Sequence, residues 1–68
     1  MKIAQLEASY NEINYLYDNQ QITKEEYLNL LQGLTIDDVI VENSEELHRK
    51  ETLHSYVNAA ITAVSSLA

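Results

Sequence analysis

The segment Asp18-Asn19-Gln20-Gln21-Ile22-Thr23-Lys24-Glu25-Glu26-Tyr27 determines the fold of the N-terminal half of the chain. Its first four residues are turn-prone and interrupt the apolar pattern. Thr23 and Glu26 have the spacing of a capping box, in which the hydroxyl of Thr23 accepts from the Glu26 backbone N–H and the Glu26 carboxylate accepts from that of Thr23. The segment therefore predicts a turn and then a helix that begins at Lys24.

Apolar residues at helical spacing lie on both sides of this turn. Before it, gaps of three and four residues predict a helix over residues 2–17, with its apolar face formed by Ile3, Leu6, Tyr10, Ile13 and Tyr17. After it, a broad apolar face predicts a helix over residues 24–32 that can pack on the first. Gly33, the single glycine, is placed to end this helix in a left-handed conformation. Two helices joined by about five polar residues form an antiparallel hairpin.

Residues 34–43 are predicted to connect the hairpin to a third helix. Thr35-Ile36-Asp37-Asp38 is suited to one short helical turn, whereas the β-branched run Val39-Ile40-Val41 is the least helix-like part of the chain. We expect Ile36, Val39 and Ile40 to enter the core. A strand is the alternative for this run, but it would have no partner strand in this chain.

The third helix is predicted over residues 45–67. Ser44 is placed to cap it, and acidic residues in its first turn are favoured by the helix dipole. Glu45 with Arg49 and Glu46 with Lys50 have the i,i+4 order that forms ion pairs on a helix surface. The first half of this helix is therefore expected to face water.

The second half of this helix is different, because every formally charged residue of the chain lies between Lys2 and Glu51. A helix that faces water normally carries charged residues on its outer side. We therefore expect a protein surface to cover residues 52–68, with contacts from Leu53, Tyr56, Val57, Ala60, Ile61, Val64 and Leu67. Tyr15, which lies off the first apolar face, is a further candidate contact. The alternative is that this apolar stripe faces the core of a monomer.

Length and charge restrict the function classes further. A chain of 68 residues forms one domain, residues 1–68, and buries only about 60% of its unfolded surface, so a second copy or a larger partner is expected to stabilise it. The net charge of −7, with four basic residues, argues against direct binding to nucleic acid. No membrane span and no signal peptide are predicted. The expected location is cytoplasmic or virion-associated.

The sequence offers no convincing chemistry. His48 and His54 lie about 240° apart around a helix and cannot share a metal ion. Asp37-Asp38 lacks the glycine and the further oxygen ligands of a calcium loop. There is no glycine-rich phosphate loop, no cysteine, and no serine with an evident base. We therefore expect no catalytic site, no metal, no cofactor and no small-molecule substrate.

Residues 16–31 resemble the hairpin of the short C-terminal domain (SHOCT) family, which has an apolar helix end, a polar turn and then Ile-Thr-x-Glu-Glu opening a second helix. The turn glycine and the lysine-rich second helix that are common in that family are missing here. The resemblance implies an oligomerisation or interaction module without catalysis. The layout of hairpin, acidic connector and Asn-Ala-Ala-Ile helix also resembles small proteins of tailed bacteriophages.

These observations predict an all-α protein: a helical hairpin, a connector with a short helical turn, and a long C-terminal helix. The expected function is that of a structural or adaptor protein, such as a phage particle or assembly component, which self-assembles or docks on a partner through its uncharged helix. The alternative is an acidic inhibitor or DNA mimic that binds a basic host or nucleic-acid-processing protein.

Overall fold

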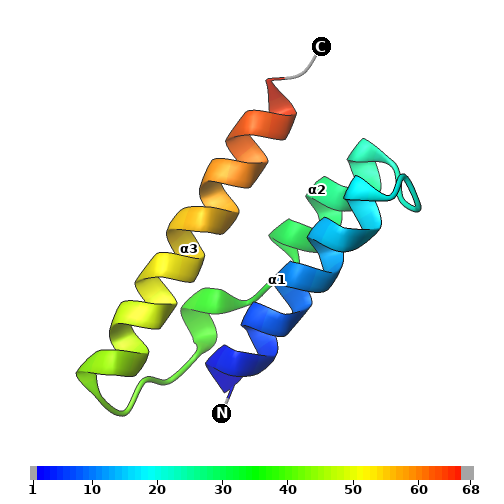
Figure 1. Cartoon of the computed structure of the whole chain (residues 1–68). Helices are drawn as coiled ribbons and strands as arrows, with labels where there is room; N and C mark the ends of the chain where they lie inside the picture. The colour runs from blue at the N-terminus through cyan, green and yellow to red at the C-terminus, as the bar shows by residue number, and fades with distance from the viewer. Residues whose placement is uncertain (1, 67–68) are drawn as a thin grey trace.

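The computed structural model describes residues 2–66, and this part of the chain contains three α-helices and one 3₁₀ turn: α1 (Lys2–Asp18), α2 (Lys24–Gln32), η1 (Ile36–Asp38) and α3 (Ser44–Ser65). α1 and α2 run in opposite directions as a hairpin, and α3 packs along both, parallel to α1 (Figure 1). No strand occurs within residues 2–66. The predicted all-α architecture is confirmed, including the helical turn in the connector.

The hairpin turn has the predicted local chemistry. The Thr23 hydroxyl accepts from the Glu26 backbone N–H at 3.1 Å, and the Glu26 carboxylate accepts from the Thr23 N–H at 2.9 Å, so the capping box is complete. Gln20 has a φ of 60°, a left-handed conformation that allows the chain to reverse. Both hydrogen bonds of the capping box join residues three apart, so the start of α2 at Lys24 has a local cause.

α2 ends at Gln32 as predicted, but the conformation of the next residue differs from the prediction. Gly33 has φ −77° and ψ −8°, a right-handed conformation, so the expected left-handed cap is wrong. The helix instead tightens, because the Gly33 N–H donates to the Asn29 carbonyl at 3.0 Å and the Leu34 N–H donates to the Leu31 carbonyl at 3.2 Å. The chain leaves this end without reversing, so it needs no left-handed residue there.

The start of α3 also differs. Asn43, and not Ser44, is the cap: its side-chain oxygen accepts from the Glu46 backbone N–H at 2.8 Å. The Glu46 carboxylate accepts from the backbone N–H of Glu42 at 3.0 Å, so the backbone N–H groups of Glu42 and Glu46 both have a partner. α3 thus begins at Ser44 and ends at Ser65, compared with the predicted 45–67. Leu67 lies outside the described residues.

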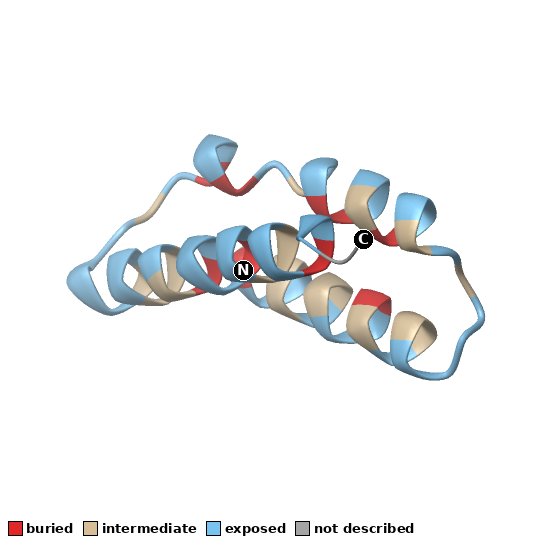
Figure 2. Cartoon of the chain, turned by 90° about the horizontal axis from the view of Figure 1, so that it is seen from above, coloured by how far each residue is buried: buried red, intermediate tan, exposed pale blue. Residues whose placement is uncertain are grey.

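One apolar cluster fills the space between the elements, and residues coloured as buried occur along each of them (Figure 2). Its buried members come from all three helices, from η1 and from the connector: Ile3, Ile13, Tyr27, Leu31, Ile36, Val39, Leu53, Val57 and Val64. Ile36 and Val39 were predicted to lie here, but Ile40 is 85% exposed. In extended backbone, successive side chains point to opposite sides, so burying Val39 directs Ile40 into solvent.

The capping box provides a test of the hairpin. Thr23→Ala removes the acceptor for the Glu26 N–H, and we expect the free energy of unfolding to fall by about 1 kcal/mol. Urea denaturation followed by circular dichroism measures this loss. Thr35→Ala is the matched control, because Thr35 makes no side-chain capping bond to η1. Equal losses in the two variants would contradict the role of the capping box.

Gly33 provides a test in which a substitution should stabilise the chain, because its conformation is right-handed. A Cβ built at Gly33 lies 3.4 Å from the Asn29 carbonyl oxygen and 3.5 Å from that of Leu30, which are ordinary contacts. Gly33→Ala should therefore raise the free energy of unfolding by about 0.4–1 kcal/mol, because alanine has fewer unfolded conformations to lose. The same denaturation measurement checks it. A clear destabilisation would show that Gly33 adopts a left-handed conformation in solution.

Candidate functional site

The first half of α3 is held to α1 by an ion pair. Arg49 donates from Nε to Glu7 at 3.2 Å and from a second guanidinium nitrogen to the other carboxylate oxygen, so the contact is bidentate. The hydrogen bond to Glu7 raises the pKa of Arg49 above its usual value. About a third of each side chain remains exposed. This pair joins the first half of α3 to α1.

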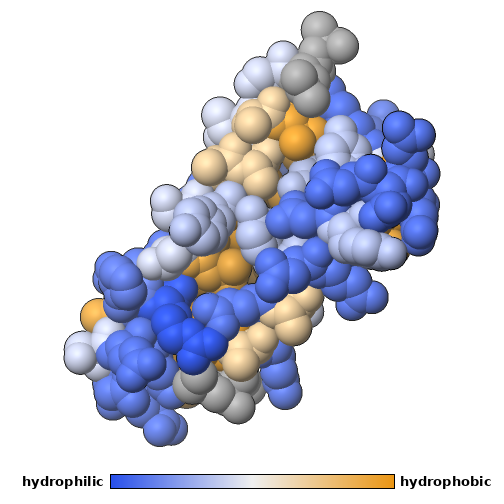
Figure 3. All heavy atoms as spheres, viewed as in Figure 1, coloured by the Kyte–Doolittle hydropathy of each residue, from blue (hydrophilic) through white to orange (hydrophobic). Residues whose placement is uncertain are grey.

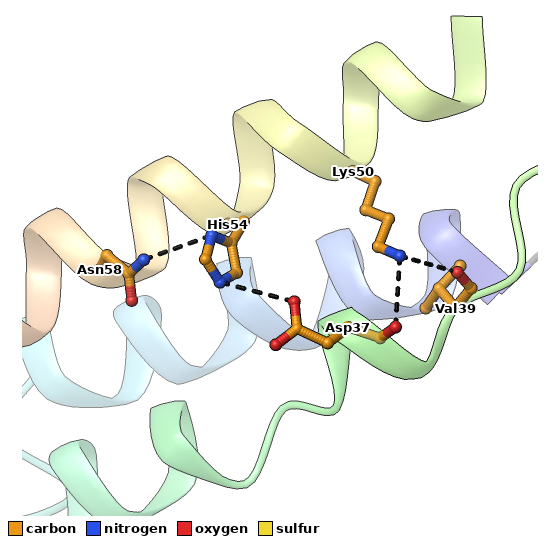
Figure 4. A network of polar contacts seen from close by, with 5 residues as sticks. All are labelled: Asp37, Val39, Lys50, His54 and Asn58. Carbon is orange, nitrogen blue, oxygen red and sulfur yellow. Dashed lines mark hydrogen bonds and ion pairs between the residues drawn. The ribbon is translucent and has the colours of Figure 1, made fainter. Parts of the chain in front are cut away.

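Lys50 contacts the connector instead of its own helix. Its Nζ donates to the backbone carbonyls of Asp37 and Val39, at 3.3 and 3.0 Å, where η1 ends (Figure 4). The predicted ion pairs, Glu45 with Arg49 and Glu46 with Lys50, are therefore replaced by contacts between elements. Spacing along one helix predicts which charges are neighbours, but it cannot show a carboxylate or carbonyl that another element brings nearer.

His54 lies in a shallow polar hollow between η1 and α3. Its Nε2 is 3.6 Å from the Asp37 carboxylate, and its Nδ1 is 3.3 Å from the Asn58 amide (Figure 4). All three side chains are exposed to solvent. Within residues 2–66, no group of three potential metal ligands occurs. These polar contacts join η1 to α3, and sequence spacing gave no indication of the contact between Asp37 and His54.

Three of the predicted interface residues lie inside the chain itself. Leu53, Val57 and Val64 are 3%, 4% and 9% exposed, and they pack against the hairpin and the connector. The chain's own core therefore accounts for the burial of these three, without any partner. The alternative considered from the sequence, a helix that faces the core of a monomer, describes this stripe of α3.

The other predicted interface residues lie closer to the surface. Tyr15 and Tyr56 are 62% and 58% exposed, the most exposed of the large apolar side chains on the helices. Ala60 and Ile61 are half-buried at the edge of the core. Leu67 lies outside the part of the chain that the structure describes. The predicted set is therefore divided between the core, its edge, and exposed positions on α1 and α3.

The outer face of α3 carries no charged residue after Glu51. It exposes Tyr56 and a series of short side chains: Ser55, Asn58, Ala59, Thr62, Ala63 and Ser66. Figure 3 shows the contrast on one side of the molecule, where apolar and nearly neutral atoms cover the C-terminal half of α3 and hydrophilic atoms cover its start. We call this exposed, uncharged surface of residues 55–66 the neutral face.

A second apolar surface was missed by the sequence analysis. Ile13 and Leu16 of α1 line a groove with Leu30 and Leu34 from α2 and the segment after it, and Leu30 is 43% exposed. The sequence did indicate this surface, because Leu28 and Leu30 lie about 160° apart around the second predicted helix and cannot both face the same neighbour. Leu28 packs against the core, so Leu30 is left on the other side.

Tyr27 is the titratable side chain most deeply placed in the hairpin. It is 4% exposed, stacks on Tyr17 with ring centroids 4.3 Å apart, and donates its hydroxyl to the Asn14 side chain. Burial, followed by the nearby Tyr10, Asp18 and Tyr17, raises the pKa of Tyr27 above its usual value of 10.0. The phenol is therefore a structural group that stays protonated in the folded chain.

This shift predicts a dependence of stability on alkaline pH. A raised pKa in the folded state means that Tyr27 contributes its full stability below pH 10.0, and that the contribution is lost as pH rises through the folded pKa. Tyr27→Phe removes the titration, so its free energy of unfolding should fall less steeply with pH in this range than that of the wild type. Denaturation at a series of alkaline pH values tests this. Equal slopes would show that Tyr27 is not protected by burial.

The chain was also compared with known proteins. No helix within residues 2–66 has both the length and the apolar character needed to cross a membrane. No protein family, no characterised protein and no solved structure matches the chain. The case for function therefore depends on the surfaces of the chain itself.

Proposed function

We propose that this protein is a small, non-enzymatic structural or adaptor component that self-assembles, or docks on a larger protein, through the neutral face of α3. One observation carries the proposal: the exposed side of residues 55–66 has no charged residue, in a chain whose net charge is −7. If two copies approached each other through an acidic surface, their carboxylates would repel. Contact through the neutral face avoids this repulsion.

The side chains of the neutral face suit a protein contact. Burying an alanine or a hydroxyl that finds a partner costs far less than burying a carboxylate. Short side chains also let a second protein surface approach the helix closely, while Tyr56 supplies one large amphipathic contact. A small core gives the chain a further reason to bind, because oligomerisation adds stability that 68 residues do not supply alone.

The concrete role that we propose is a particle or assembly component of a tailed bacteriophage, located in the host cytoplasm or in the virion. The layout of hairpin, connector and C-terminal helix supports it. The resemblance of residues 16–31 to a SHOCT hairpin supports the wider role in oligomerisation or interaction, and the complete capping box at Thr23 and Glu26 fits that resemblance.

A second candidate is an acidic inhibitor that mimics DNA. One observation favours it: eleven acidic residues stand against four basic ones, and two of the basic residues, Arg49 and Lys50, are engaged in contacts within the chain. Such an inhibitor would bind a basic target, and its affinity would fall about tenfold or more between low and physiological salt. Apolar assembly through the neutral face should not weaken in this way, so salt dependence separates the two functions.

Assembly through the neutral face can be tested by adding a charge to it. Ala59→Glu places a carboxylate at an exposed position of α3 that tolerates it in a monomer. In an interface, that carboxylate would be desolvated, and we expect self-association to weaken at least about tenfold, or about 1.4 kcal/mol. Sedimentation velocity up to high micromolar concentration measures this.

Gln5→Glu is the matched control, since it adds the same charge at an exposed position in the first turn of α1, away from the neutral face. It should assemble like the wild type. A wild-type protein that is monomeric throughout, and that captures no partner in a manner sensitive to Ala59→Glu, would refute the proposed function.

A further inference from the structure

The groove between α1 and α2 is a docking surface that the proposed function does not use. Ile13, Leu16, Leu30 and Leu34 form its apolar floor and walls, together with Gly33, and α3 contributes no residue to it. Its rim is polar, with Ser9, Glu12 and Asn29. Leu30 is 43% exposed in the last turn of α2, where a helix of another protein could pack over it.

Charge restricts which part of a second copy can enter this groove. Glu12 on the rim repels another carboxylate, and α1, α2, η1 and the start of α3 all carry acidic residues. The neutral face, in contrast, brings no acidic residue to the groove. Its serine and threonine hydroxyls can donate to the Glu12 carboxylate and accept from the Asn29 amide at the rim.

Shape favours the same pairing over contact between two neutral faces. Two neutral faces would bring together mainly alanines and hydroxyls, with Tyr56 as the single large side chain on each. That arrangement buries little apolar area compared with the roughly 800 Å² per partner of a typical stable interface. Against the groove, the short side chains of α3 allow the leucines to approach its backbone closely, and more apolar surface leaves water.

We propose that the groove between α1 and α2 receives the neutral face of α3 from a second copy of this chain. The contact joins two different surfaces, so each copy offers one groove and one neutral face. It is therefore a head-to-tail contact, which repeats from copy to copy in a larger assembly. This inference rests on the proposed self-assembly and names the surface that the neutral face meets.

Two variants of the full-length chain test the pairing. Leu30→Glu blocks the groove and leaves the neutral face intact, whereas Ala59→Glu blocks the neutral face and leaves the groove intact. Each variant alone should self-associate at least about tenfold more weakly than the wild type. An equimolar mixture should recover a complex of one copy of each variant, because one groove and one neutral face remain compatible. Native mass spectrometry distinguishes the two variants by mass.

Leu47→Glu is the matched control. Leu47 is also a leucine that is 43% exposed on a helix, but it lies outside the groove and the neutral face, so its variant should assemble like the wild type. Circular dichroism establishes that each variant is folded. Leu30→Gln, which adds no charge, replaces Leu30→Glu if the latter loses helix, and it should weaken assembly in the same direction.

The remaining outcomes separate this inference from the proposed function. If Leu30→Glu and Leu30→Gln assemble like the wild type while Ala59→Glu does not, the neutral face meets something other than the groove, and only this inference fails. A mixture of two folded, monomeric variants that forms no complex also overturns it. If Ala59→Glu assembles like the wild type, or the wild type is monomeric at high micromolar concentration, self-assembly through the neutral face fails as well.

Discussion

Burial of a single small apolar cluster is the constraint on which the rest of this structure depends. The hairpin contributes Ile3 and Leu31, which are each 1% exposed, but the cluster is complete only when η1 and α3 cover it. The chain has no cysteine, so no disulfide supports it. α2, with nine residues, is shorter than the roughly 12–15 residues below which isolated helices are marginal in water, so packing of its apolar face stabilises it.

The distribution of charge follows from that packing. Arg49 binds Glu7 on α1, and Lys50 binds the carbonyls at the end of η1, so two of the four basic residues join α3 to the other elements. Partly exposed ion pairs of this kind contribute little to stability. They also withdraw positive charge from the surface, which leaves the exterior strongly acidic.

α3 consequently has two halves with different environments. Its first half is anchored by charge, and its second half buries Leu53, Val57 and Val64 while it exposes an uncharged outer face. One helix thus serves both as part of the core and as the surface best suited to meet another protein. The groove beside Leu30 is the apolar surface of the hairpin that α3 does not cover. An acidic chain can bring these two surfaces together without opposing carboxylates.

The sequence alone determined the local structure, because capping and helical spacing act within a few residues. The capping box at Thr23 joins residues three apart, and the bounds of α2 and the position of the short turn at Ile36 agree with the prediction. It did not determine the cap at Asn43 or the right-handed Gly33, since neighbouring residues of similar propensity compete and the exit path of the chain decides between them.

Only the tertiary structure decided which apolar side chains are buried and which charges pair. Val57 and Tyr56 are adjacent in a helix, yet one is 4% and the other 58% exposed, because the position of the hairpin determines which side of α3 is covered. The partner of Arg49 lies 42 residues away, beyond the reach of any spacing rule. Leu30 remained exposed for the same reason: its helix has an apolar stripe wider than one neighbour can cover.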